Sequence, residues 1–460
     1  MVLKRMEQHK IFLTKSRLVD KDESAFSCDH KVLLYAPLRY VCYSIRRYIK
    51  ESEQFMTTKL ACDNGLRIIT ENMPHMRSVA IGIFVNVGSR YEKPEENGLT
   101  HFIEHMLFKG TKTYSAKQLA EEFDRLGAQT NAFTSKDQTC YYAVSLDYEA
   151  RKTIALLADL FFNSTFREED IEKERQVILE EIAMSEDDPE DNVDERLWQA
   201  MFRGTQMAAP ILGTEATLKT FTKEKIEQFM HEHYTPSEVI ISLAGNVDDE
   251  LVQYVVETFN QFNNTARPQI THTKPQFQPN HVEREMAIEQ AHLALGFEGL
   301  AVDDPDIVSL LVLNNIVGDS MSSRLFQKVR EEKALAYSVY SYYSSYEDMG
   351  AWMVYGGTSM KQLDDMERTI LAVLDDVKQN GVTDEEITRA KTQLESGLLL
   401  GLETSFDYMN RNARNEMTYG EHRSVEDSLK ELHAVTADSV ARVIDRVLSK
   451  AHARSVIKSK

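Results

Sequence analysis

Hydrophobic residues recur along this chain with two different periods, one typical of strands and one typical of helices. A continuous apolar run at 79–87 (VAIGIFVNV) predicts a buried strand. The turn signal Asp63-Asn64-Gly65 lies between two short apolar runs and predicts a hairpin. Helical patterning dominates residues 151–202. Further strands are expected at 130–146, 239–244 and 292–297.

Capping residues predict where two of the helices begin and end. Thr100 is a candidate N-cap for a helix that stops near Gly110. Ser115-x-x-Gln118 has the form of a capping box, and Gly127 is a candidate stop for the helix that it starts.

The two halves of the chain resemble each other. A shift of 216 residues superimposes residues 166–182 on 382–398 and carries Gly204 onto Gly420. Chance similarity between two amphipathic helices is the alternative, but the matched offset over some forty residues favours an internal duplication. We therefore expect an α+β protein with two related, sandwich-like α/β domains, each a mostly antiparallel sheet packed with helices.

The expected domain boundaries follow from composition. The stretch 263–280 carries three prolines and little apolar periodicity, so we place the linker there, between an N-terminal domain at 56–270 and a C-terminal domain at 281–460. Residues 1–55 lack the features of a secretory signal or a transit peptide, and we expect them to be poorly ordered. They are either a divergent leader or an extension upstream of Met56.

Composition and charge exclude several classes of protein. The 460 residues are 42% hydrophobic, yet nowhere do about 18 apolar residues follow one another, so no membrane span is expected. The net charge of −20 argues against nucleic acid as a partner. Four cysteines without a C-x-x-C pair indicate neither a disulfide framework nor a cysteine-zinc site, and favour a reducing compartment.

The strongest chemical signal is the sequence His101-Phe102-Ile103-Glu104-His105. On a helix, residues at i, i+3 and i+4 share a face, so both imidazoles can reach one ion while Glu104 lies beside them. Zinc accepts such ligands and leaves a position for water, whose proton Glu104 could take. Two surface histidines on an amphipathic helix are the alternative.

A catalytic zinc ion requires a third protein ligand. The helix expected at 168–184 offers Glu174 and Glu181, which share a face, and Glu180, which points elsewhere. Periodicity alone does not decide which face meets the histidines. In the second half, the same shift places Ala390 and Gly397 opposite Glu174 and Glu181, and no H-x-x-E-H is present. The second copy is therefore expected to keep the fold without the metal.

The motifs HFIEHMLFKGT, NAFTSKDQTCYYA and ERQVILEEI resemble those of the inverzincin metallopeptidases. The resemblance is to the M16B branch, which includes bacterial processing-protease-like proteins and the β subunit of mitochondrial processing peptidase. It implies one Zn²⁺ per chain, with His101, His105 and Glu181 as ligands. It also implies that Glu104 is the general base and that Glu174 orients a ligand.

The resemblance further implies how a substrate binds. Asn131, Ala132 and Phe133 match an edge strand that pairs with the substrate backbone. Arg330 and Tyr337 match a pair that holds the substrate near the cleaved bond. Without the resemblance, these residues would be assigned to ordinary strand packing and to a surface helix charge. A homodimer is implied, in which the Arg/Tyr pair serves the partner's zinc site.

The expected function is that of a zinc-dependent endopeptidase acting on short or unfolded peptides. The wording of the motifs favours a cytoplasmic bacterial protein over one of the mitochondrial matrix. The alternative is a non-catalytic scaffold or a peptide-binding subunit of a heteromeric processing complex.

Overall fold

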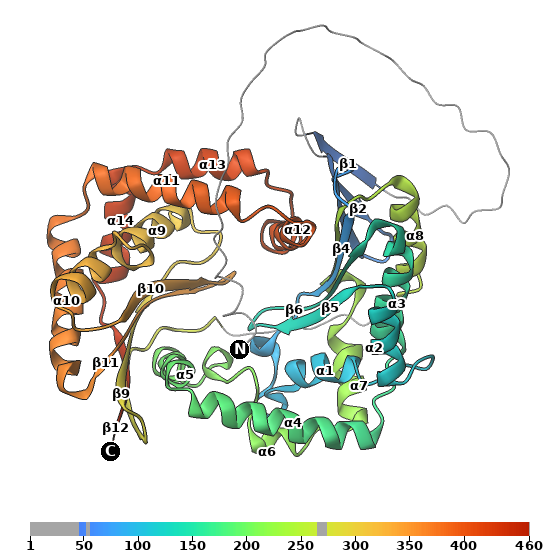
Figure 1. Cartoon of the computed structure of the whole chain (residues 1–460), viewed down its shortest axis with the longest axis horizontal. Coiled ribbons are helices and arrows are strands. Elements are labelled where there is room, and N and C mark those ends of the chain that lie inside the picture. Colours follow the sequence, from blue (N-terminus) through green and yellow to red (C-terminus); the bar gives the residue numbers. More distant parts are fainter. Residues whose placement is uncertain (1–45, 52–55, 265–273, 460) are drawn as a thin grey trace, which may run out of the picture. The chain divides into compact units, whose positions relative to one another are not determined.

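Two β-sheets, one from each half of the chain, organise the protein (Figure 1). The computed structural model describes residues 46–51, 56–264 and 274–459. The first sheet has the strand order β1-β2-β3-β7-β4-β6-β5, and its neighbours are antiparallel except for the parallel pair β3 and β7. Its strands are β1 Arg46–Glu51, β2 Met56–Ala61, β3 Arg67–Asn72, β4 Ser78–Val85, β5 Gln129–Thr134, β6 Thr139–Leu146 and β7 Val239–Gly245.

The second sheet repeats the topology of the first. Its order is β10-β11-β9-β12-β8, and only β12 and β8 run parallel. Strand for strand, this order matches β5-β6-β4-β7-β3 of the first sheet, including the position of the parallel pair. Its strands are β8 His281–Met286, β9 Gln290–Glu298, β10 Ser338–Ser345, β11 Gly350–Ser359 and β12 Ala453–Ser459.

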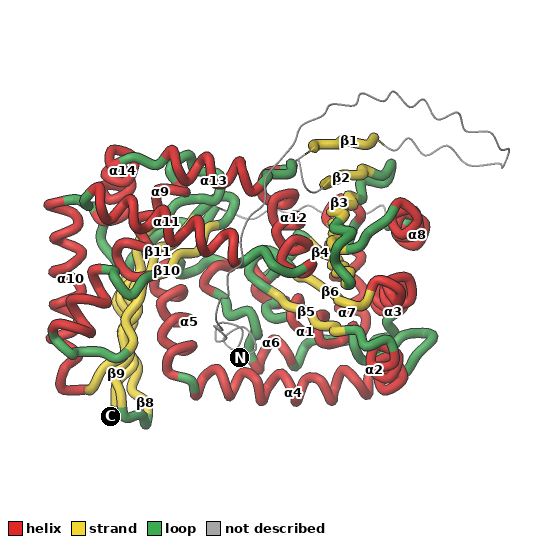
Figure 2. The backbone as a smooth tube through the Cα atoms, turned by 45° about the horizontal axis from the view of Figure 1, so that its top comes forward, coloured by secondary structure: helices red, strands yellow, loops and turns green. Residues whose placement is uncertain are grey.

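Helices follow the strands in a matching order in both halves (Figure 2). The long helices α4 and α11 begin at Glu168 and Asp384, and α5 and α12 begin at Pro189 and Ser405, so each pair is offset by 216 residues. The predicted fold class, with two related domains, is therefore confirmed. The helices are α1 Leu99–Leu107, α2 Ala116–Arg125, α3 Ala150–Asn163, α4 Glu168–Asp187, α5 Pro189–Met201, α6 Glu215–Leu218, α7 Lys223–His233, α8 Asp249–Phe259, α9 Ile307–Asn314, α10 Leu363–Asn380, α11 Asp384–Leu400, α12 Ser405–Tyr419, α13 Val425–Ala434 and α14 Ala437–Leu448.

The two halves exchange one helix each. Helix α5 of the first half contacts β9 and β12 of the second sheet, whereas α12 of the second half contacts β4 and β7 of the first. A central glycine admits each helix, because a Cβ at Gly296 would lie 2.4 Å from Met201 Sδ and one at Gly82 would lie 3.0 Å from Met409 Sδ. This reciprocal packing joins the halves through apolar surface.

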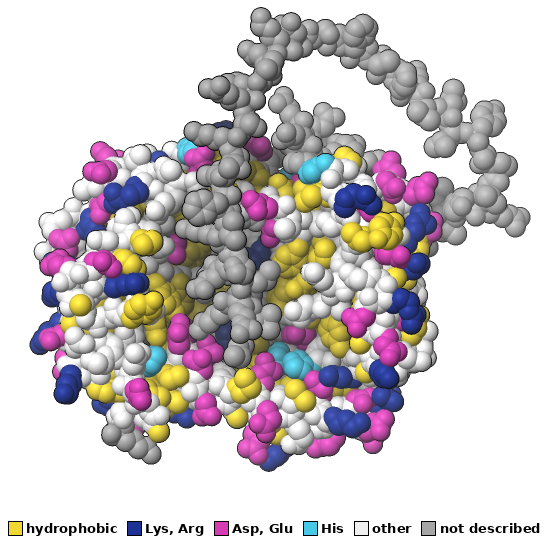
Figure 3. Space-filling view, viewed as in Figure 1, with side chains coloured by type: hydrophobic (Ala, Val, Ile, Leu, Met, Phe, Trp, Pro, Cys, Tyr) yellow, Lys and Arg dark blue, Asp and Glu magenta, His cyan; other side chains and the backbone are white. Residues whose placement is uncertain are grey.

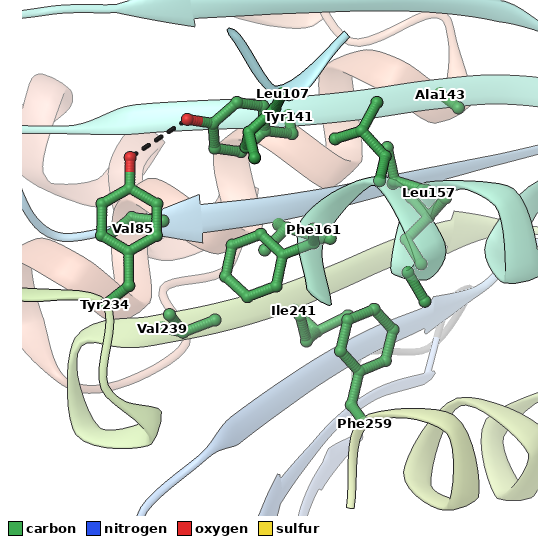
Figure 4. Packing of buried hydrophobic residues seen from close by; sticks show 14 of the residues in the cluster. Val85, Leu107, Tyr141, Ala143, Leu157, Phe161, Tyr234, Val239, Ile241 and Phe259 are labelled. Carbon is green, nitrogen blue, oxygen red and sulfur yellow. Dashed lines mark hydrogen bonds between the residues drawn. The ribbon is translucent and has the colours of Figure 1, made fainter. Parts of the chain in front are cut away.

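The main core of the first half lies between its sheet and the helices on one face (Figure 4). Leu157 and Phe161 of α3 pack on the strands, and the ring of Phe161 stacks on that of Tyr234. The hydroxyls of Tyr141 and Tyr234 are buried and lie 3.0 Å apart, so they satisfy each other. This packed layer supports α1, which carries the H-x-x-E-H sequence.

Most local predictions hold. The 63–65 turn joins antiparallel β2 and β3, and Ser115 and Gln118 form a capping box at α2. Thr100 is not an N-cap, because α1 begins one residue before it, with Gly98 as the N-cap. Residues 46–51, which the sequence places in the leader, form β1 against β2. The rest of the predicted leader, except Met56's neighbours from that residue onward, lies outside the described residues.

Acidic and basic side chains are interspersed on the face seen in Figure 3. The acidic balance of the chain therefore does not gather into one continuous patch on this face. Within the part of the chain that the structure describes, no helix has both the length and the apolar character needed to cross a bilayer.

Candidate metal centre

Helix α1 presents its polar residues together because its other face is buried. Leu99, Phe102, Ile103, Met106 and Leu107 are part of the core of the first half. The helical period then places His101, Glu104 and His105 on the opposite side, toward α4 and β5.

A buried carboxylate holds the first turn of α1. Glu92 Oε1 accepts hydrogen bonds from the Thr100 backbone N–H at 2.7 Å and from its hydroxyl at 2.6 Å. Glu92 Oε2 accepts one from the Gly98 N–H at 2.8 Å. Burial raises the pKa of Glu92 to about 7, although these hydrogen bonds oppose the rise. Glu92 thus satisfies helix N–H groups that would otherwise lack partners, next to His101.

Three side chains converge as a metal-ligand set: His101, His105 and Glu181. The Nε2 atoms of both histidines lie 3.7 Å from Oε2 of Glu181, and the three ligand atoms all lie within 4.8 Å of one another. Among the described residues, this is the one group of three or more such side chains close enough to share an ion. Two imidazoles and one carboxylate are a donor set of catalytic zinc sites, so the residues fit zinc.

The electrostatics of the two histidines differ. Burial, together with the adjacent His105, lowers the pKa of His101 to about 3, so its imidazole is neutral. Its Nδ1 is buried and has no hydrogen-bond partner. Burial also lowers the pKa of His105, but the hydrogen bond to Glu174 and nearby carboxylates outweigh it and raise the pKa overall. A cation bound here would displace a proton from His105.

Glu174 orients His105 from one turn pair away on α4. Its Oε1 lies 2.8 Å from His105 Nδ1, and its Oε2 forms a 2.7 Å ion pair with Lys109. Because a carboxylate accepts, Nδ1 of His105 carries the proton and Nε2 is left as a donor to metal. Glu174 is buried, whereas Glu181 is half-exposed.

Glu104 lies beside the ligand set and is half-buried. Burial raises the pKa of its carboxyl group, and a 2.5 Å hydrogen bond from Thr134 Oγ1 to Oε2 opposes the rise. Its Oε1 accepts no hydrogen bond from the described residues. The carboxylate therefore has one anchored oxygen and one that is free to exchange a proton.

Strand β5, with Asn131, Ala132 and Phe133, is the last strand of the first sheet and pairs with β6 alone. Asn131 is exposed, whereas Phe133 is half-buried near Tyr142. The strand ends at Thr134, so the edge leads directly to Glu104. An unpaired strand edge can accept another extended segment by backbone hydrogen bonding.

Arg330 and Tyr337 lie together but apart from the ligand set. The Arg330 guanidinium lies 4.6 Å from the ring centres of both Phe326 and Tyr337. Tyr337 is 82% exposed. Within the described residues, neither side chain forms a hydrogen bond or ion pair with the histidines or with Glu181.

The sequence did not predict Glu92, Lys109 and the hydroxyl of Thr134 as parts of this centre. Lys109 is four residues after His105, a spacing that indicates a shared helix side. No local pattern connects Thr134 with Glu104 or Glu92 with α1, since these contacts form only when strand, loop and helix pack.

The fold and the ligand set define a member of peptidase family M16. The family model described as insulinase (peptidase family M16) matches residues 67–215, and the model described as the peptidase M16 inactive domain matches 220–394. The chain belongs to this family. The inactive-domain match falls largely on the half that lacks the H-x-x-E-H sequence.

Similar proteins carry the names of zinc proteases. The chain is 46% identical over 403 residues to the uncharacterized zinc protease YmxG of Bacillus subtilis, covering 87% of this chain and 98% of that protein. It is 41% identical over 401 residues to the uncharacterized zinc protease SCO5738 of Streptomyces coelicolor, covering 85% and 87%. These relationships place the chain in a family of zinc metalloproteases.

A solved structure supports the fold independently. The crystal structure of a protease from Helicobacter pylori superimposes with a TM-score of 0.81 at 20% identity, covering 89% of this chain and all of that one. At that identity the similarity concerns the fold alone.

Proposed function

We propose that this protein is a zinc-dependent endopeptidase that hydrolyses peptide bonds in short or unfolded peptides. The observation that carries the proposal is the placement of Glu104. Its carboxylate lies beside the His101, His105 and Glu181 ligand set, and one of its oxygens is free to act as a base. A purely structural metal site has no need of such a group.

In the proposed site, His101, His105 and Glu181 hold one Zn²⁺ per chain. Bound zinc supplies Lewis-acid chemistry, which polarises a carbonyl group and makes water more acidic. Glu104 accepts a proton from the attacking water and delivers it to the amine nitrogen as the peptide C–N bond breaks. Glu174 keeps His105 in the tautomer and orientation that present Nε2.

Substrate binding is assigned to β5 and to the Arg330/Tyr337 pair. The backbone at Asn131, Ala132 and Phe133 pairs with an extended peptide, which gives affinity with limited side-chain selectivity. Arg330 is held between two rings, and its guanidinium donates to a substrate carbonyl or to the developing oxyanion.

We assign catalysis to residues 56–270 and the non-metal copy to 281–460. The proposed assembly is a cytoplasmic homodimer in which Arg330 and Tyr337 serve the partner's metal site. Their separation from the ligand set within one chain supports this assignment.

Metal analysis with a peptide assay tests the function. The purified protein should contain about one zinc per chain, lose activity with a chelator and regain it with Zn²⁺. Glu104→Gln should keep the zinc and lose about 10²–10⁴-fold in kcat. Zinc without cleavage of any unfolded peptide would instead favour the scaffold or peptide-binding subunit.

A mixing experiment tests the dimer. Neither Glu104→Gln nor Arg330→Ala homodimers should turn over substrate well, but a heterodimer of the two should recover one working site. An isolated heterodimer that remains as inactive as its parents would contradict the sharing of residues between subunits.

A further inference from the structure

The hydroxyl of Thr134 is the one described side-chain group that hydrogen-bonds Glu104. Thr134 is the last residue of β5, the edge strand of the first sheet, whereas Glu104 lies on α1. The 2.5 Å bond from Oγ1 to Oε2 therefore connects the strand edge with the carboxylate.

We propose that Thr134 is a positioning residue that anchors Oε2 of Glu104, so that Oε1 alone exchanges the proton during peptide hydrolysis. This inference rests on the proposed function. As the water oxygen bonds to the carbonyl carbon, one water proton passes to Oε1. That proton passes to the peptide nitrogen when the C–N bond breaks, and Thr134 keeps its own hydroxyl proton throughout.

The geometry explains why an anchor is useful. A glutamate side chain has several rotatable bonds, and the helix restricts mainly the first of them. Without a second contact, the half-buried carboxylate would sample orientations in which neither oxygen faces the reacting water. Holding a catalytic group in one geometry lowers the entropic part of the barrier. Oε1, which accepts no bond from the described residues, is the oxygen left for the reaction.

The same bond ties the base to the substrate edge. Thr134 is in register with Thr139 of β6, so the pairing of the β5–β6 hairpin fixes the height of its hydroxyl. A peptide that docks on β5 would thus be aligned on the element that also aligns Glu104. The position of the scissile bond and the orientation of the base then share one reference.

The residue opposite Thr134 supplies a matched control. Thr139 is buried, and its hydroxyl donates to the Val87 carbonyl at 2.9 Å rather than to a group of the metal centre. Thr139→Val therefore removes the same atom from the neighbouring strand and leaves Glu104 anchored.

The test compares Thr134→Val with Thr134→Ser and Thr139→Val in the zinc-loaded full chain. Thr134→Val should lower kcat about 10–100-fold with KM changed less than about threefold and with zinc content unchanged. Thr134→Ser should keep at least about half of kcat, because it keeps the hydroxyl. Thr139→Val should lower thermal stability yet keep kcat. Wild-type kcat in Thr134→Val, or an equal loss in Thr134→Ser, overturns the proposal.

A double mutant and crystal structures separate positioning from a general structural effect. Adding Thr134→Val to Glu104→Gln should cost less than about twofold, because the anchored group is already disabled. A further loss as large as that in the wild-type background contradicts the proposal. If the wild type cleaves no peptide, the proposed function fails. Thr134 is then judged by crystal structures, where one fixed Glu104 orientation in Thr134→Val contradicts anchoring and several support it.

Discussion

The two halves place a helix against the edge hairpin of each sheet, yet the polar contacts at that junction differ in kind. In the first half, Thr134 bonds one oxygen of Glu104, and the carboxylate stays half-buried with the other oxygen free. In the second half, Asn314 Oδ1 accepts from Ser341 Oγ and Trp352 Nε1, both at 2.8 Å, and all three residues are buried. A closed, satisfied network fixes a structure, whereas an incomplete one leaves a group for chemistry.

The largest difference should come from the third ligand. Glu181→Ala should abolish zinc binding and lower activity by at least ~10³-fold, because zinc supplies several kcal/mol of transition-state stabilisation. The fold should remain, since Glu181 is half-exposed. Metal analysis, peptide assays and circular dichroism check this.

The equivalent position in the second half provides the control. Gly397→Ala, in α11, meets no atom within 4 Å of the new Cβ. It should raise stability by up to about 1 kcal/mol through helix propensity and leave zinc and activity unchanged. Equal zinc loss in both variants would mean that the two copies do not differ in the way proposed.

The buried network of the second half should matter for stability alone. Asn314→Ala leaves the Ser341 and Trp352 donors without that acceptor, which should cost about 2–4 kcal/mol of unfolding free energy. Urea denaturation measures the loss, and the folded protein should keep its zinc and its kcat. Lost zinc in the folded variant would show that the second network supports the metal centre.

The carboxylates that begin the two helices should respond differently to pH. Glu92 at α1 is raised to a pKa of about 7, chiefly by burial, whereas Asp306 at α9 is paired with Arg442 and Arg446. Because the folded state binds the Glu92 proton more tightly than the unfolded chain, this contribution to stability is lost as pH rises from about 4.5 to about 7.

Glu92→Gln should remove that contribution. Between about pH 5 and pH 8, the wild type should lose up to about 3 kcal/mol relative to Glu92→Gln, as measured by urea unfolding in the presence of a chelator. Parallel pH profiles for the two proteins would show that the Glu92 proton does not differ between the folded and unfolded states.

The smallest expected effect concerns the support of His105. Glu174→Ala should weaken zinc binding about 10–100-fold, since outer carboxylates typically contribute that much, and Glu174→Gln should weaken it less because an acceptor remains. Competition with a chelator measures both. The equivalent residue is Ala390, so the helix itself tolerates alanine at this position. Unchanged affinity in Glu174→Ala would remove the assigned role.

Local chemistry allowed much of the fold to be predicted from the sequence. The 63–65 turn, the Ser115 capping box and the strand at 79–87 depend on residues close in sequence, and each is present. The Thr100 prediction was wrong because a distant carboxylate, Glu92, satisfies that turn. A cap supplied from outside the helix leaves no signal in the local pattern.

The sequence by itself determined that His101, Glu104 and His105 share one side of a helix, because helical spacing is a local property. It also determined the duplication, because the offset between the copies is written in their residues. Only the tertiary structure decided which residues of α4 and β5 meet that helix. The packing of α4 on α1 set Glu181 at the ligands and Glu174 at His105, and the end of β5 set Thr134 on Glu104. Those contacts join segments 30 to 80 residues apart, and burial of the apolar faces, rather than any local pattern, fixes their register.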